Sequence, residues 1–130
     1  MDGKTIDFTA AEWHVMECLW AHAPLTGREA AQRLQTETGW SRSTTLTLLR
    51  RLAEKGAVRY EDSGSVRTFF PTITRECAAV RQTRDLLGRV YHGSLSMLVS
   101  AMTREETLPQ EEIDELYALL NEMEAKNRRD

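Results

Sequence analysis

Hydroxyl and guanidinium side chains are mixed with leucines in the segment WSRSTTLTLLRRLAEKG, residues 40–56. Lysine, glutamate and alanine would form a more stable water-facing helix than serine and threonine do, so this composition needs a reason. One interpretation is an ordinary solvated face. The other is a surface that contacts a polar, anionic partner, because hydroxyl and guanidinium groups bond to phosphates and to the edges of bases.

Helical geometry, with about 100° between successive residues, divides this segment into two faces. The face predicted to be buried consists of Thr45, Leu48, Leu49 and Leu52. The opposite face suits a DNA major groove, where arginine pairs with guanine, hydroxyls bond to bases or phosphates, and an apolar side chain contacts a thymine methyl. The predicted contacts at the bases or nearby phosphates are Arg42, Ser43, Thr44, Leu46, Thr47 and Arg50, and those that position the protein on the backbone are Ser41, Arg51 and Arg67, with Arg59 a weaker candidate.

Patterns typical of catalysis or metal binding are missing from the sequence. His14, His22 and His92 form no HExxH or other short ligand motif, and Cys18 and Cys77 are single and far apart. The sequence also lacks GxGxxG, P-loop and GxSxG motifs. We therefore predict no enzyme activity, no catalytic residue, no metal site and no cofactor.

Three helix-start signals precede residue 57, and they define the elements that must position the DNA-facing residues. In the first two, a threonine is followed three residues later by a glutamate, which is the pattern of a capping box. Glycine then closes the second and third helices. The predicted helices run from caps at Thr9, Thr26 and Ser41 to ends near Pro24, Gly39 and Gly56.

After Gly56 the pattern changes from helical spacing to extended chain. In AVRYEDSGSVRTFFP, β-favouring residues lie on both sides of the turn-forming residues 62–65, and Pro71 closes the second arm. Three short helices followed by a β-hairpin is the order of a winged helix-turn-helix domain. We predict this domain for residues 1–74.

The distribution of charge supports an anionic partner for this part of the chain. The net charge is −3, which would disfavour nucleic acid if it were evenly spread. Residues 41–75, however, hold seven basic and three acidic residues, whereas residues 76–130 hold seven basic and eleven acidic ones. A partner responds to the local field more than to the total.

From Arg75 onward, helical spacing returns as three amphipathic stripes, interrupted at Gly93 and again at Pro109. These helices either fold back on the first 75 residues or interlock with a second copy. We favour a homodimer, with residues 75–130 as its helical dimerisation domain, because small cores gain most from oligomerising. The predicted dimerisation residues are Leu86, Leu87, Val90, Tyr91, Leu95, Leu98, Val99, Met102, Ile113, Leu116, Tyr117, Leu120 and Met123.

The location of the protein is also predicted from the sequence. No apolar run approaches the length of a membrane span, and the N-terminus is polar and acidic where a signal peptide is basic and then apolar. We expect a cytoplasmic protein without membrane insertion. The overall prediction is a mainly α fold with a small β-hairpin.

Six pieces, in this order and spacing, resemble the penicillinase (β-lactamase and methicillin-resistance) repressors of bacteria and the related copper-transport repressors over nearly the whole chain. They are AEWHVMECLW (11–20), PLTGREAA (24–31), WSRSTTLTLLRRLAEKGAV (40–58), FFP (69–71), TRDLLGRVYHGSLSMLV (83–99) and LPQEEIDELYALL (108–120). The resemblance implies a homodimeric transcriptional repressor with one winged helix on each half of a roughly palindromic operator. It also implies a membrane sensor with a zinc-protease domain that triggers cleavage in the C-terminal region.

The chain departs from the family pattern in three features. Leu46 stands where the family commonly has a basic residue, which favours a methyl contact at that place. Ala101 and Met102 occupy the position of the Asn-Phe pair that is typically cleaved. The C-terminus EAKNRRD lacks the Cys-x-Cys motifs of the copper repressors, so no copper sensing is expected.

A second hypothesis belongs to another class of function. Winged helices also serve in protein interactions, since a fold does not dictate a function. In that case the C-terminal helices and the winged helix would bind a protein partner, and no DNA contact would form.

Overall fold

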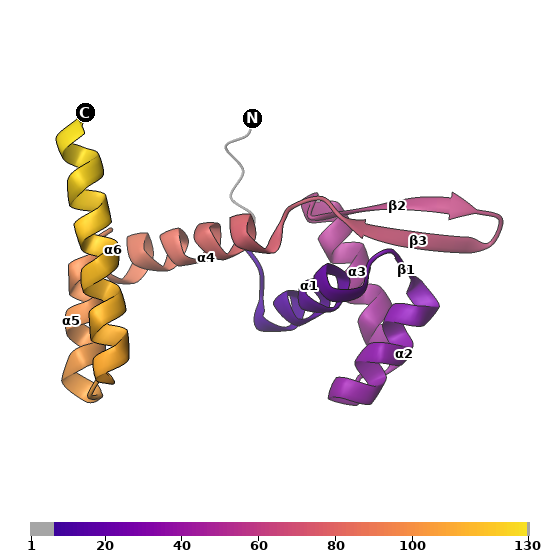
Figure 1. Cartoon of the computed structure of the whole chain (residues 1–130). Coiled ribbons are helices and arrows are strands. Elements are labelled where there is room, and N and C mark those ends of the chain that lie inside the picture. The colour runs from indigo at the N-terminus through magenta and orange to yellow at the C-terminus, as the bar shows by residue number, and fades with distance from the viewer. Residues whose placement is uncertain (1–6, 130) are drawn as a thin grey trace. The chain divides into compact units, whose positions relative to one another are not determined.

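The computed structural model describes residues 7–129 and shows a mainly helical chain with one small sheet (Figure 1). It divides into two compact units, Met1–Leu86 and Leu87–Asp130. The assignment of DNA binding and dimerisation to either side of residue 75 stays a prediction. In chain order the elements are α1 (Ala10–His22), β1 (Leu25–Thr26), α2 (Gly27–Thr38), α3 (Arg42–Lys55), β2 (Val58–Ser63), β3 (Val66–Pro71), α4 (Arg75–Val90), α5 (Leu95–Glu105) and α6 (Gln110–Arg129).

The starts of α1, α2 and α3 are determined by local hydrogen bonds, as predicted. The Thr9 hydroxyl accepts a bond from Glu12 N at 3.1 Å, and Glu12 Oε1 accepts one from Thr9 N at 2.9 Å. Thr26 and Glu29 repeat this capping box at the start of α2 with the same distances. The Ser41 hydroxyl accepts a bond at 3.3 Å from a backbone N–H in the first turn of α3. These caps satisfy N–H groups that a helix start leaves without partners.

Glycine ends α2 and α3 where the backbone turns into the left-handed region. Gly39 has φ of 80° and Gly56 has φ of 84°, a conformation in which any other L residue is strained. The tight end at Gly56 passes the chain from α3 directly into β2. The hairpin therefore starts beside the C-terminus of α3.

The sheet is antiparallel with the strand order β1-β3-β2. The β2–β3 hairpin pairs Val58 with Pro71 and Ser63 with Val66, and its turn is Gly64 and Ser65. The turn chemistry predicts a turn at 62–65, but residues 62 and 63 belong to β2 because both have partners on β3. The sequence pattern does not predict β1, where Leu25 pairs with residue 69, because a two-residue strand exists only through such a distant pairing.

The core of the first unit lies where α1, α2 and α3 meet the sheet. Val15, Met16, Leu19, Leu34 and Leu49 have no accessible surface. The face of α3 that was predicted to be buried is confirmed as buried: Thr45, Leu48, Leu49 and Leu52.

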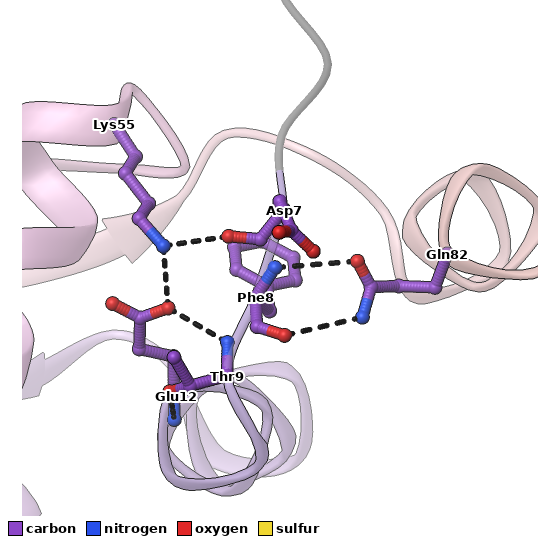
Figure 2. Close-up of polar contacts among 6 residues, drawn as sticks. All are labelled: Asp7, Phe8, Thr9, Glu12, Lys55 and Gln82. Atoms are coloured by element: carbon purple, nitrogen blue, oxygen red, sulfur yellow. Dashed lines mark hydrogen bonds and ion pairs between the residues drawn. The ribbon is translucent and has the colours of Figure 1, made fainter. Parts of the chain in front are cut away.

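An ion pair between a buried carboxylate and an accessible lysine joins α1 to the end of α3. The Glu12 carboxylate is 2% exposed, and Lys55 Nζ lies 2.5 Å from its Oε1 and 2.6 Å from the carbonyl oxygen of Asp7 (Figure 2). Burial by itself raises the pKa of Glu12, but the hydrogen bonds from Lys55 and from the Thr9 backbone outweigh it and hold that pKa below its ordinary value. The charged form of Glu12 is therefore the stable one in the folded unit.

The same N-terminal segment is bonded to α4. Phe8 N donates to Gln82 Oε1 at 3.2 Å, and Gln82 Nε2 donates to the Phe8 carbonyl oxygen at 3.4 Å, as Figure 2 shows. The side-chain amide of Gln82 thus pairs with both backbone groups of Phe8, as a neighbouring strand would in a β-sheet. It holds the segment before α1 between the end of α3 and the first half of α4.

The second unit exposes its apolar side chains. α5 starts at Ser94, whose hydroxyl accepts a bond from Met97 N at 3.1 Å, and no residue of α5 or α6 is buried. No helix in residues 7–129 combines the length and the apolarity that crossing a membrane requires. Of the predicted dimerisation residues, Leu86, Val90, Leu95, Val99, Met102, Tyr117, Leu120 and Met123 are exposed, and Leu87, Tyr91, Leu98, Ile113 and Leu116 are half-buried.

Candidate nucleic-acid interface

An open groove of about 1040 Å³ lies between the exposed face of α3 and the β2–β3 hairpin, with the start of α2 at its edge. It brings together five of the nine predicted DNA contacts, from two elements. The groove is lined by Thr26, Gly27, Arg28, Arg42, Leu46, Thr47, Arg50, Ala53, Glu54, Tyr60, Ser65, Val66, Arg67 and Phe69.

The other four predicted contacts lie beside the groove. Ser43, Thr44 and Arg51 line a second hollow of about 250 Å³ that shares Thr47 with the groove. The fourth residue, Ser41, is the N-cap of α3. Apart from Arg67 on β3, the predicted residues therefore form two neighbouring surfaces of α3 and its N-cap.

Hydroxyl groups cluster at the N-terminus of α3. Ser41 Oγ lies 3.2 Å from Ser43 Oγ and 3.0 Å from Thr44 Oγ1. The first turn of α3 contains no acidic residue, so the positive end of the helix dipole is not neutralised within the turn. A phosphate placed there would meet hydroxyl donors and the free N–H groups of the helix start.

Four arginines on α2 and α3 form no ion pair within residues 7–129. They are Arg28 on α2 and Arg42, Arg50 and Arg51 on α3, and all four are exposed. Of the residues that line the groove, Arg28, Arg42 and Arg50 contribute positive charge against the single carboxylate of Glu54 on the helices.

Leu46 lies partly under the groove surface. It is 37% exposed, and its Cδ2 atom is 3.1 Å from the position that a Cβ on Gly27 would occupy. Phe69 Cε2 approaches the same position at 3.6 Å. Glycine at position 27 therefore lets the start of α2 approach α3 closely. The expected contact of Leu46 with a thymine methyl stays a prediction, and only the accessible part of the side chain is available for it.

The two hairpin arginines differ from these four arginines of α2 and α3, because both hairpin arginines are paired with carboxylates. Arg67 Nε lies 2.7 Å from Asp62 Oδ1 and Nη2 lies 3.2 Å from Oδ2, and Cζ is 3.8 Å from the centre of the Tyr60 ring. The hydrogen bonds from Arg67 lower the pKa of Asp62, and Asp62 raises the pKa of Arg67. Arg59 Nη1 lies 2.8 Å from Glu61 Oε2.

Some groove residues were not predicted from the sequence. Arg28 and Tyr60 line the groove, yet neither belongs to the helix face that the periodicity singled out. Arg28 reaches it because α2 packs on α3, and Tyr60 because β2 follows α3 after one tight turn. The order of elements was the only available signal: in a helix-turn-helix the helix before the recognition helix also approaches the DNA backbone.

The residues considered for other chemistry are not among those that line this groove. Ala101 and Met102, the predicted cleavage pair, are inside α5, where Ala101 is half-buried and Met102 is 50% exposed. Cys18 is buried in the core and Cys77 is exposed on α4. Within residues 7–129, no three His, Cys, Asp or Glu side chains gather as a metal ion would require.

Comparison with known proteins relates the whole chain to bacterial repressors. The model of the family described as penicillinase repressor matches residues 8–122. The penicillinase repressor of Bacillus licheniformis is 34% identical over 126 residues, which is 97% of each chain. The methicillin resistance regulatory protein MecI of Mammaliicoccus sciuri is 28% identical over 121 residues, covering 93% of this chain and 98% of that protein.

Two solved structures match the winged part of the chain. The solution structure of the DNA binding domain of the repressor BlaI has a TM-score of 0.52 at 32% identity, covering 55% of this chain and 88% of that one. The Bacillus licheniformis BlaI monomeric form, solved in complex with the blaP half-operator, has a TM-score of 0.50 at 32% identity, covering 56% and 89%. The predicted fold class, a winged helix-turn-helix within a mainly α chain, is confirmed.

Proposed function

Since this chain belongs to the penicillinase repressor family, a family of transcriptional repressors and not of enzymes, we propose that it represses transcription by binding double-stranded DNA through the groove between α3 and the hairpin. The observation that carries this proposal is the set of arginines on α2 and α3 without ion pairs, which line a groove beside an exposed helix face. The relative solved with a half-operator supports the same mode of binding.

In this mode α3 enters the major groove. Arg50 and Arg42 reach base edges or nearby phosphates, Thr47 and Leu46 contact the same base pairs, and the hydroxyls at the start of α3 meet the backbone. The hairpin lies along the neighbouring backbone with Arg67. Binding then depends strongly on salt, because each phosphate that an arginine neutralises releases counterions.

We further propose that the repressor is a homodimer and reads a roughly palindromic operator in the cytoplasm. The exposed apolar residues of α5 and α6 support this assembly, because a patch of that kind marks an interaction surface. A two-fold dimer places its two recognition helices about one helical turn of DNA apart, or a multiple of it. Cleavage between Ala101 and Met102, triggered by a membrane sensor protease, would divide α5 and so release the operator. The relation to copper-transport repressors stays a prediction.

The experiment titrates the whole chain into labelled DNA from upstream of its own gene. Fluorescence anisotropy measures the affinity at salt concentrations from roughly 50 to 200 mM. We expect affinity to fall steeply over this range. Arg50→Ala should weaken binding by about 1–3 kcal/mol and relax the preference at one base pair. Arg81→Ala, on the exposed surface of α4 outside the groove, is the matched control and should bind like the unaltered chain.

A flat salt dependence would contradict the proposal that this groove binds DNA. Equal binding by Arg50→Ala and the unaltered chain would contradict it as well. In that case the second hypothesis, a protein-interaction module, would account for the exposed surfaces. Its sign would be a partner protein that binds equally well when Arg50 is replaced.

A further inference from the structure

The two faces of the β2–β3 hairpin carry the same arrangement of charges. On one face Arg67 is paired with Asp62 and lies over Tyr60, and on the other Arg59 is paired with Glu61 and lies 4.1 Å from the centre of the Phe70 ring. Asp62 and Arg67 share a face because they are directly opposite each other in the register. Glu61 and Arg59 lie on the other face because side chains alternate along a strand. Only the first set lines the groove, through Tyr60 and Arg67.

The charge of Arg67 is paired within the hairpin, at its surface, where the side chains of Arg67 and Asp62 are 49% and 52% exposed. Both carboxylate oxygens of Asp62 accept from the guanidinium, from Nε at 2.7 Å and from Nη2 at 3.2 Å, while the Tyr60 ring covers one face of the group. These two N–H donors form the planar edge that recognises a phosphate in bidentate fashion. Asp62 thus occupies one bidentate edge of the guanidinium, and a DNA phosphate that binds the remaining N–H groups approaches the negative charge of Asp62.

The arginines that line the groove from α2 and α3 are not paired with a carboxylate in this way. Arg28, Arg42 and Arg50 line it without an ion pair in the described part of the chain, so each can neutralise a phosphate and release a counterion. An arginine that is already neutralised by a carboxylate releases fewer counterions when a phosphate arrives. It also brings that phosphate close to a second negative charge.

We propose that Asp62 restrains Arg67 and thereby limits the affinity of this protein for DNA. This inference rests on the proposed function, since it names a residue that controls the strength of that binding. Asp62 does not touch the DNA. It acts through Arg67, as a carboxylate that competes with the phosphates for one guanidinium.

The test is Asp62→Asn in the full-length chain, with binding to the upstream DNA measured from roughly 50 to 200 mM salt. Asparagine keeps the size of the side chain and removes the charge, so Arg67 becomes free to pair with phosphate. We expect binding at 100 mM salt to tighten by about three- to tenfold per hairpin, and the slope of log affinity against log salt to steepen by about 0.9 per phosphate gained.

The matched control is Glu61→Gln, one residue away on the other face of the same strand. It changes the net charge by the same amount and frees Arg59, which does not line the groove. We expect a smaller gain in affinity than for Asp62→Asn and little change of the salt slope. Equal gains for both variants would mean that net charge alone is responsible, and this would overturn the inference.

A second pair of variants separates restraint from orientation. Arg67→Gln should weaken binding less when Asp62 is present than when Asp62 is asparagine, and it should remove the gain in affinity that Asp62→Asn gives. If Asp62→Asn weakens binding, then Asp62 orients Arg67 towards the DNA, and the inference is wrong. Failure of the proposed function would give a different result, because the unaltered chain itself would then show no salt-dependent binding to DNA.

Discussion

The two compact units of the chain use apolar side chains in opposite ways. In the first unit Leu19, Leu34 and Leu49 have no accessible surface, whereas in the second Tyr117 is 64% exposed and Leu120 is 61% exposed. Covered apolar surface stabilises a unit by itself, because its burial removes it from water on folding. Exposed apolar surface gives that stabilisation only when something else covers it. The first unit thus has its own core, and the second supplies a surface.

The largest expected effect comes from Leu120→Lys, which introduces a charge into the exposed apolar surface of the second unit. In the proposed dimer the ammonium group would be buried in an apolar interface, so the dimer should dissociate into monomers. Operator affinity should then fall by about 10²- to 10⁴-fold, because the second winged helix no longer binds at a high effective concentration. Analytical ultracentrifugation measures the dimer, and a mobility shift with the upstream DNA measures the affinity.

Ala118→Lys is the control for this substitution. Ala118 is exposed and, at about 100° per residue, lies on the opposite side of α6 from the stripe that contains Leu120. It adds the same charge to the same helix, so it should leave both the dimer and the operator affinity nearly unchanged. Equal loss for both variants would mean that charge on α6, and not the apolar stripe, governs assembly.

The same leucine-to-alanine substitution in each unit tests the comparison directly. Leu49→Ala should lower the free energy of unfolding by about 2–5 kcal/mol, because it leaves a cavity in a closed core. Leu120→Ala should change it by no more than about 0.5 kcal/mol at concentrations where the chain is monomeric. Urea denaturation at low protein concentration measures both. A large loss for Leu120→Ala in the monomer would show that the second unit has a core of its own.

Local signals explain how much of this fold could be predicted from the sequence. The capping threonines and the glycines at 39 and 56 act on neighbouring residues only, so the helix limits in the first unit were predicted well. β1 was missed because Leu25 and Thr26 become a strand only when residues 68 and 69 lie beside them. No local pattern distinguishes such a strand from a loop.

The candidate site was predictable to the extent that it follows one helix. The α3 face could be deduced from periodicity because its buried and exposed sides alternate within a single element. The place of Arg28 in the groove and the restraint of Arg67 by Asp62 depend on packing and on strand register, which the sequence order does not contain. Which of these residues contact DNA stays a prediction.

The ion pair between Lys55 and Glu12 should make the stability of the first unit depend on pH. The pKa of Glu12 is lowered on folding, so its contribution is present above the ordinary value of 4.5 and is lost as pH falls through the lower folded value. Lys55→Met leaves a buried carboxylate without its cation and should cost about 1–3 kcal/mol at pH 7. Without Lys55 the charged carboxylate loses its cation while burial still disfavours it, so protonation of Glu12 by acid relieves the penalty.

Denaturation of the unaltered chain and of Lys55→Met between pH 7 and pH 3 provides the measurement. The difference in unfolding free energy should shrink as pH falls below about 4.5 and through the lowered pKa of Glu12, because the unaltered chain loses its ion pair as Glu12 becomes protonated. Arg81→Met removes an exposed cation from α4 and should give a small difference that is nearly constant with pH. A difference that persists unchanged at pH 3 would mean that Lys55 stabilises by packing alone.

The smallest expected effect concerns an imperfection in the closed core. Thr45 has no accessible surface, and its hydroxyl has no hydrogen-bond partner within the described residues. Thr45→Val keeps the shape and removes an unpaired polar group, so the unfolding free energy should rise by about 1 kcal/mol, with DNA affinity unchanged. Thr47→Val makes the same change two residues later, on the groove side, and should alter DNA affinity and not stability. If Thr45→Val destabilises the unit instead, the Thr45 hydroxyl has a hydrogen-bond partner in solution. Water would then reach the core of the first unit, although Thr45 is buried.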